Sequence, residues 1–163
     1  MGVKNLLTLP EDIHNLLDGT DLTDSLDKFK DDISKMMLSR FASDEKEPSI
    51  RMSNIGKPLR QLWFELNAKK FNIKPEKTTG QTKFKFLYGH LLESLALYLA
   101  EVSGHKVERL QEEIEVDGVK GHIDAVIDGV LVDVKSCSSY SFNKFKSGAL
   151  FQDDPFGYVA QLS

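Results

Sequence analysis

The sequence predicts a mixed α/β fold, and two patterns lead to this prediction. Phe84 to Val102 carries leucines at three- and four-residue steps, the spacing typical of a helix with a buried apolar face. Val107 to Ser136 instead alternates apolar and polar residues, and Asp-Gly pairs at 117–118 and 128–129 interrupt it as hairpin turns would. We therefore expect a helix, an antiparallel three-stranded meander and a further helix, preceded by a helical N-terminal extension.

Length and composition indicate one globular domain without a strong charge. The chain has 163 residues, 40% of them hydrophobic, and a formal net charge of −4, so it has no global basic field. Its single cysteine, Cys137, excludes a disulfide framework and a four-cysteine iron–sulfur cluster within the chain. Because no apolar run reaches the ~18 residues of a membrane span and no signal peptide opens the chain, we expect a cytoplasmic protein with no membrane partner.

Residues 1–47 are expected to form a charged helical arm, and residues 48–163 the core of the domain. Leu9-Pro10-Glu11-Asp12 has the proline and the acids of a helix start. Leu22 to Phe41 places apolar residues at helical spacing, which favours packing of this helix on the body of the domain. Binding of a protein partner through the arm is the alternative.

Ile50 to Phe64 combines basic residues with a turn. Ser53, Asn54 and Gly56 indicate the turn, and Pro58 suits the first turn of a following helix. Positive charge beside the amide donors of a helix start favours phosphate, although a surface loop leading into a helix explains the stretch equally well. The residues expected to contact nucleic acid are Arg51, Ser53, Lys57 and Arg60, with Lys144 and Lys146 further along the chain.

Glu93 lies in the middle of the helix predicted at Phe84–Val102, which is apolar nearly all round and is therefore expected to be buried. A buried carboxylate needs a compensating partner. The simpler interpretation is a narrow polar stripe that Glu93 shares with Ser94 and Glu101.

The hairpin predicted at Gly121–Ser136 brings two acids together. With Asp128-Gly129 as the loop, Ile127 faces Val130, and three pairs further along Asp124 faces Asp133. Like charges with Cβ atoms roughly 5 Å apart repel each other, and a divalent cation such as Mg²⁺ would offset the repulsion. Lys135 points to the same face; a merely solvated polar face is the alternative. The opposite face is the predicted core face, with Ile123, Ala125, Ile127, Val130, Val132 and Val134.

The strand before this hairpin is predicted at Val107–Val116, with Asp117-Gly118 as a second turn. The same counting places Glu115 opposite Lys120, as an ion pair, and Glu113 opposite His122. His105 has no neighbours in the sequence that would make it a ligand.

Two of these motifs resemble those of a known family. Gly121-x-x-Asp124 followed by Asp133-Val134-Lys135 resembles the PD-(D/E)XK nuclease superfamily, and Gly89-x-x-x-Glu93 resembles the first motif of its RecB-like branch, which includes phage exonucleases. The resemblance implies a restriction-endonuclease-like core and an exonuclease that hydrolyses DNA with Mg²⁺ or Mn²⁺. It also implies that Lys135 orients or activates the attacking water. The metal ligands that it implies are Glu93, Asp124, Asp133 and the Val134 carbonyl.

The last residues resemble only the beginning of a motif. Tyr158-x-x-Gln161 is similar to the start of the last motif of the RecB-like branch, in which Gln161 would position the substrate or Lys135. Because the sequence given stops at Ser163, we expect the core to be incomplete at its C-terminal end. An inactive nuclease-fold protein that binds nucleic acid or a protein partner is therefore the alternative function.

Overall fold

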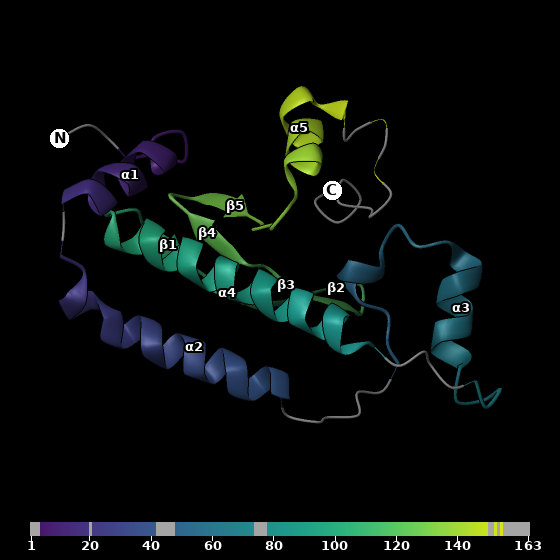
Figure 1. The fold of residues 1–163 in the computed structure, drawn as a ribbon. Coiled ribbons are helices and arrows are strands. Elements are labelled where there is room, and N and C mark those ends of the chain that lie inside the picture. The colour runs from purple at the N-terminus through teal and green to yellow at the C-terminus, as the bar shows by residue number, and fades with distance from the viewer. Residues whose placement is uncertain are drawn as a thin grey trace. The chain divides into compact units, whose positions relative to one another are not determined.

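A computed structural model describes residues 4–19, 21–41, 48–73, 78–149, 152 and 154 of the chain. It is a mixed α/β protein with small antiparallel sheets, which confirms the predicted class (Figure 1). The chain divides into two compact units. The first consists of Met1–Asp44, Thr78–Glu112 and Ile123–Ser136, and the second of Glu45–Lys77, Glu113–His122 and Cys137–Ser163.

The first unit is built around its longest helix. It contains α1 (Leu9–Gly19), the short 3₁₀ helix η1 (Thr23–Ser25), α2 (Leu26–Phe41) and α4 (Gly80–Val102). Its sheet has the strand order β1-β4-β5, with β1 at Val107–Glu108, β4 at Ala125–Ile127 and β5 at Val130–Val132. Helix α4 lies between α2 and the β4–β5 hairpin (Figure 1).

Helix α2 packs on α4, as the sequence predicts. The rings of Phe29 and Tyr98 stack with their centroids 4.7 Å apart, and the Tyr98 hydroxyl forms a hydrogen bond with Ser25 Oγ. Lys28 also makes an ion pair with Glu101. Helix α2 is thus attached to α4 by one aromatic contact and two polar contacts.

The hydrophobic core joins α4 to the sheet. Ala100 and Ala125 are fully buried, Ile127 is 2% exposed, and Val132 and Val134 pack against this cluster. The predicted core face of the hairpin is therefore confirmed at these positions. The prediction is wrong for Val130, which is 46% exposed beside the hairpin turn.

Helix α4 has a side-chain cap at its start and a glycine with positive φ after its end. Thr79 Oγ1 accepts a hydrogen bond from the Thr82 N–H at 3.2 Å, which caps the start of the helix. At its end Gly104 has φ +91°, and the His105 N–H bonds the Ala100 carbonyl at 3.1 Å in a Schellman motif, as a C-terminal glycine predicts.

The expectation that α4 is buried all round is wrong for its first half. Phe84 is 69% exposed and Phe86 61%, whereas the buried residues Leu97, Tyr98 and Ala100 all lie in the second half. A helix of this length spans roughly 35 Å, at 1.5 Å per residue. Strands of two or three residues span only about 10 Å, so the sheet of the first unit covers only part of the helix.

A buried histidine ties α1 to the hairpin turn. The His105 side chain is fully buried, with Nδ1 2.6 Å from Asp128 Oδ2 and Nε2 3.1 Å from Asp12 Oδ2. The hydrogen bond with His105 lowers the pKa of the Asp128 carboxyl below its usual value. The partners of His105 lie far away in the sequence, so reading its sequence neighbours did not reveal them.

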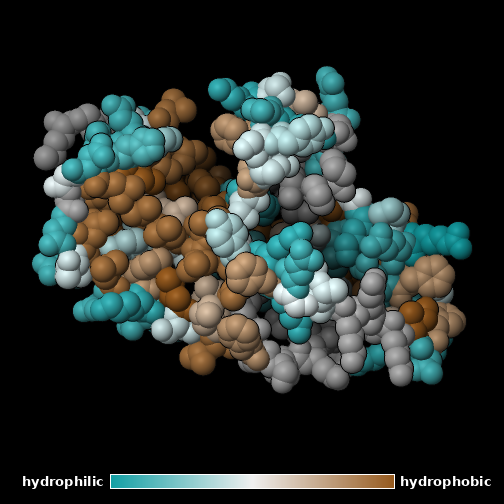
Figure 2. Space-filling model, in the orientation of Figure 1, coloured by the Kyte–Doolittle hydropathy of each residue, from teal (hydrophilic) through white to brown (hydrophobic). Residues whose placement is uncertain are grey.

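The second unit contains η2 (Met52–Asn54), α3 (Leu59–Asn67), the hairpin of β2 (Glu113–Val116) and β3 (Val119–His122), and α5 (Ser139–Ser147). A Cβ on Gly121 would lie 2.6 Å from Met52 Sδ, so only glycine lets η2 pack against β3. At the position of α3 in Figure 1, Figure 2 shows brown, hydrophobic atoms at the surface beside teal, hydrophilic ones. None of the helices among the described residues is both long and apolar enough to cross a membrane.

Candidate functional site

Helix α4 brings Glu93 toward the segment that follows β5. A Cβ on Gly89, one turn before Glu93, would lie 3.4 Å from Ser136 Oγ, which is ordinary van der Waals contact, so this turn of α4 lies against the segment after β5. The Glu93 side chain is only 15% exposed, and its Oε2 lies 3.5 Å from His90 Nδ1. The carboxylate is therefore partly buried, between its own helix and the strand region.

Asp124 is fixed by the backbone of the segment that follows β5. The ladder between β4 and β5 pairs Ala125 with Val132, so its register is the predicted one. The ladder ends there, and one residue earlier the Asp124 Oδ2 atom accepts a hydrogen bond from the Val134 N–H at 2.7 Å. Asp124 is thus held by a main-chain donor in the segment after β5, which also carries Asp133.

The strand predicted at Val107–Val116 is two strands, and a bulge separates them. Val107 pairs with Ile127 and Glu113 pairs with His122, which is six residues further on one strand but only five on the other. One strand thus has an extra residue, the defining feature of a β-bulge. Arg109 and Gln111 within it have positive φ angles of 52° and 50°. The prediction of one continuous strand is therefore wrong. The sequence has no turn signature here that would have indicated the bulge.

The bulge aims the Gln111 side chain at both acids. Its Nε2 donates to Glu93 Oε1 at 2.5 Å and lies 3.5 Å from Asp124 Oδ1, while the Gln111 N–H donates to the Asp124 carbonyl at 3.1 Å. Left-handed backbone at a residue other than glycine costs about 1–3 kcal/mol and is common at functional sites. We name Glu93, Gln111 and Asp124 the amide-bridged acid pair.

The two carboxylates offer oxygen atoms that a hard cation could take as ligands. Mg²⁺ and similar hard cations take carboxylate oxygens at about 2.0–2.6 Å. The Gln111 nitrogen already lies 2.5 Å from one such oxygen and 3.5 Å from the other. These oxygens are of the kind that Mg²⁺ or Mn²⁺ takes. At the position of the amide nitrogen Glu93 lies within that range, whereas Asp124 would have to move closer to bind the same ion.

Asp133 and Lys135 pair with each other. Lys135 Nζ donates to Asp133 Oδ1 at 2.6 Å, and both side chains are about one-third exposed. Val134, between them, gives its N–H to Asp124, as described above. Among the described residues, no three His, Cys, Asp or Glu side chains gather closely enough to hold a metal ion. Gln161 lies outside the described residues.

The second hairpin has the predicted register, with Glu115 opposite Lys120 and Glu113 opposite His122. The predicted ion pair across the strands is present, with Lys120 Nζ 3.7 Å from Glu115 Oε2. Lys120 Nζ lies closer, however, to Glu113 Oε1, at 2.8 Å. Lys120 thus sits between two acids, and its contact with them raises its pKa above the usual value.

The basic residues expected to contact nucleic acid belong to the second unit. Arg51 precedes η2, where it bonds Ser49 Oγ at 3.5 Å, and Ser53 lies exposed within that helix. Lys57 makes an ion pair with Glu65 at 2.9 Å. Arg60 stands over the Phe64 ring of α3.

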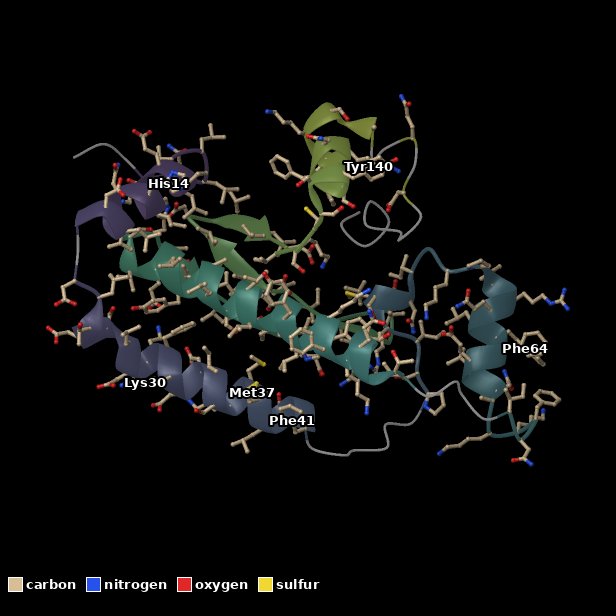
Figure 3. The ribbon with its side chains drawn as sticks, in the orientation of Figure 1. His14, Lys30, Met37, Phe41, Phe64 and Tyr140 are labelled. Atoms are coloured by element: carbon tan, nitrogen blue, oxygen red, sulfur yellow. The ribbon has the colours of Figure 1, made fainter. Side chains whose placement is uncertain are left out.

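On α5, which also belongs to the second unit, Lys144 Nζ lies 5.5 Å from the ring centroid of Tyr140, a residue labelled in Figure 3. Lys146 lies in the last turn of the same helix. The two lysines thus place positive charge near the C-terminal end of α5, where it interacts favourably with the negative end of the helix dipole.

Sequence reasoning missed Gln111 and His90, which both contact Glu93. For His90 a signal existed, since it lies three residues before Glu93 on one helix face. For Gln111 no signal existed, because its role depends on the bulge.

Comparison of the chain with protein-family models, curated proteins and solved structures gave no match in any of the three.

Proposed function

We propose that this chain is a metal-dependent nuclease that hydrolyses phosphodiester bonds of DNA, as an exonuclease, with a restriction-endonuclease-like core. The observation that carries the proposal is the amide-bridged acid pair. Helix α4 and the residue just before β4 contribute one carboxylate each, and the two contact the same amide nitrogen. The Asp133-Val134-Lys135 segment adjoins Asp124 through the Val134 N–H.

Glu93 and Asp124 would hold Mg²⁺ or Mn²⁺, with Asp133 and the Val134 carbonyl as the further ligands that the sequence motif implies. A bound divalent ion would lower the pKa of a water molecule and stabilise charge on the phosphate. The residues of the chain supply the rest. The Val134 N–H fixes the orientation of Asp124, and partial burial of Glu93 keeps its carboxylate in place.

Lys135 would act on the attacking water and on the charge of the transition state. Its ammonium group lies 2.6 Å from Asp133, so the aspartate fixes it in the segment that follows β5. A cation at this position offsets negative charge that develops on the phosphate. Arg51, Ser53, Lys57, Arg60, Lys144 and Lys146 would contact the backbone of the DNA, and Gln161 would position the substrate or Lys135.

Cleavage of end-labelled linear DNA and of circular DNA tests this function. We expect products from linear DNA with Mg²⁺ or Mn²⁺ and none with EDTA. Asp124→Asn should abolish cleavage, because the amide cannot replace a carboxylate ligand. Asp117→Asn is the matched control, since this exposed turn residue has φ +51°, which asparagine tolerates. Equal activity of the two variants would contradict the site.

The alternative is an inactive nuclease-fold protein that binds nucleic acid or a protein partner. The ion pair between Asp133 and Lys135 favours it, because both groups then already have a partner. This alternative predicts DNA binding that is the same with Mg²⁺ and with EDTA, and no product from any labelled DNA or RNA.

A further inference from the structure

Three aromatic rings lie together on the surface of the second unit. Trp63 is 49% exposed, Phe64 41% and Phe71 49%. The Trp63 ring meets the Phe64 ring edge to face at 5.1 Å and the Phe71 ring at 5.4 Å. We name these three residues the aromatic platform; Figure 3 shows its Phe64 side chain projecting from α3.

The backbone after α3 folds Phe71 onto this helix. The Asn67 side chain bonds the Trp63 carbonyl at 2.8 Å, and the Phe71 N–H bonds the Asn67 carbonyl at 3.2 Å. The chain then turns at Asn72, which has φ +51°, and the Ile73 N–H bonds the Ala68 carbonyl at 2.8 Å. This is a Schellman motif with asparagine in the left-handed position. Backbone hydrogen bonds after α3 thus hold Phe71 next to the ring of Trp63.

Positive charge accompanies the rings. Arg60 Cζ lies 5.9 Å from the Phe64 ring centroid, and Lys70 Nζ lies 5.8 Å from that of Phe71. Residues 57–71 contain four basic side chains and one acid, Glu65, which Lys57 neutralises at 2.9 Å. The surface around the rings is thus cationic within a chain whose net charge is −4.

We propose that the aromatic platform binds single-stranded DNA by stacking on unpaired bases, while Arg60 and Lys70 contact the neighbouring phosphates. Exposed rings beside cations suit a polyanion whose bases are free to stack, and every base offers such a face. The bases of a duplex are stacked on one another, so duplex DNA can use only the charges. The choice of nucleic acid as the ligand rests on the proposed function.

Trp63 is the sole tryptophan of the chain, so its fluorescence reports on the platform alone. We expect oligo(dT), titrated in EDTA so that no cleavage occurs, to quench this emission to saturation. Binding should weaken as salt rises. Duplex DNA and an abasic strand of equal length should bind more weakly, the abasic strand by about tenfold.

Phe71→Leu separates stacking from simple burial, because leucine keeps an apolar side chain but lacks a ring face. It leaves the Trp63 signal in place, and we expect it to weaken oligo(dT) binding about tenfold. Phe86→Leu on α4 is the matched control, since Phe86 is 61% exposed and lies in the first unit. Circular dichroism should show that both variants are folded; if Phe71→Leu is not, Phe71→Tyr should bind like wild type.

Several results would overturn the proposal. These are an unchanged Trp63 emission with oligo(dT), equal binding by Phe71→Leu and wild type, and binding of oligo(U) without binding of oligo(dT). A shift of the emission with protein concentration alone would identify the platform as a contact between copies of the chain. Cleavage without quenching would refute the platform and leave the nuclease function standing; quenching without cleavage would do the reverse.

Discussion

Replacing Gln111 with alanine should change stability and metal binding in opposite directions. The variant loses a hydrogen bond from an amide to a carboxylate, measured at 2.5 Å between Gln111 Nε2 and Glu93 Oε1. Hydrogen bonds to charged groups contribute about 1.5–3 kcal/mol. Because Gln111 is itself exposed, we expect about 1–2 kcal/mol of lost stability in EDTA. For a chain of this size that lowers Tm by about 3–6 °C.

Metal binding should improve in the same variant. In the wild-type protein a cation between Glu93 and Asp124 must first displace the amide nitrogen, whereas in Gln111→Ala it need not. The affinity should therefore rise by up to about tenfold, the equivalent of 1.4 kcal/mol. Mn²⁺ should thus raise Tm at lower concentrations than in wild type, because binding only to the folded state stabilises it.

Differential scanning fluorimetry across a Mn²⁺ titration measures both effects. Gln61→Ala is the matched control, since the Gln61 amide also donates to a carboxylate, that of Glu65, at 2.8 Å, but at a place away from Glu93 and Asp124. It should leave the response to Mn²⁺ unchanged. A weaker response in Gln111→Ala than in wild type would refute the displacement argument and would mean that Gln111 contributes a ligand oxygen.

Three further predictions address other groups. Lys135→Ala should abolish most single-turnover cleavage with little loss of DNA binding, because its interaction belongs to the transition state; an unchanged rate would exclude Lys135 from the chemical step. Replacement of three basic residues with alanine should make the salt dependence of DNA binding shallower, and an unchanged slope would leave them only a structural role. Those residues are Arg51, Lys57 and Arg60. The third prediction concerns pH. The hydrogen bond with His105 lowers the pKa of Asp128 in the folded protein, so it stabilises the fold at pH above the unfolded pKa of Asp128, about 3.9. This contribution is lost as pH falls through the lower pKa that Asp128 has in the folded protein. Acid titrations of Tm should therefore be flatter for Asp128→Asn; a parallel curve would contradict the pairing.

The sequence predicted the registers of both hairpins because a two-residue Asp-Gly turn fixes the count locally. Asp117 and Asp128 do have the positive φ angles that such turns need. The bulge at Arg109–Gln111 could not be predicted in the same way, since it contains neither glycine nor asparagine. Its left-handed residues are held by contacts distant in sequence, among them the hydrogen bond between the Gln111 N–H and the Asp124 carbonyl.

The reason for expecting a cation also changes with the structure. The sequence argument relied on repulsion between Asp124 and Asp133 as direct cross-strand neighbours, but the ladder ends one pair before them, at Ala125 and Val132. The chain itself offsets their charges, through the Val134 N–H for Asp124 and through Lys135 for Asp133. Repulsion within the hairpin is thus no longer an argument for metal. The argument that remains is the convergence of Glu93 and Asp124 on one amide nitrogen, which is why Gln111 is the residue whose replacement tests it most directly.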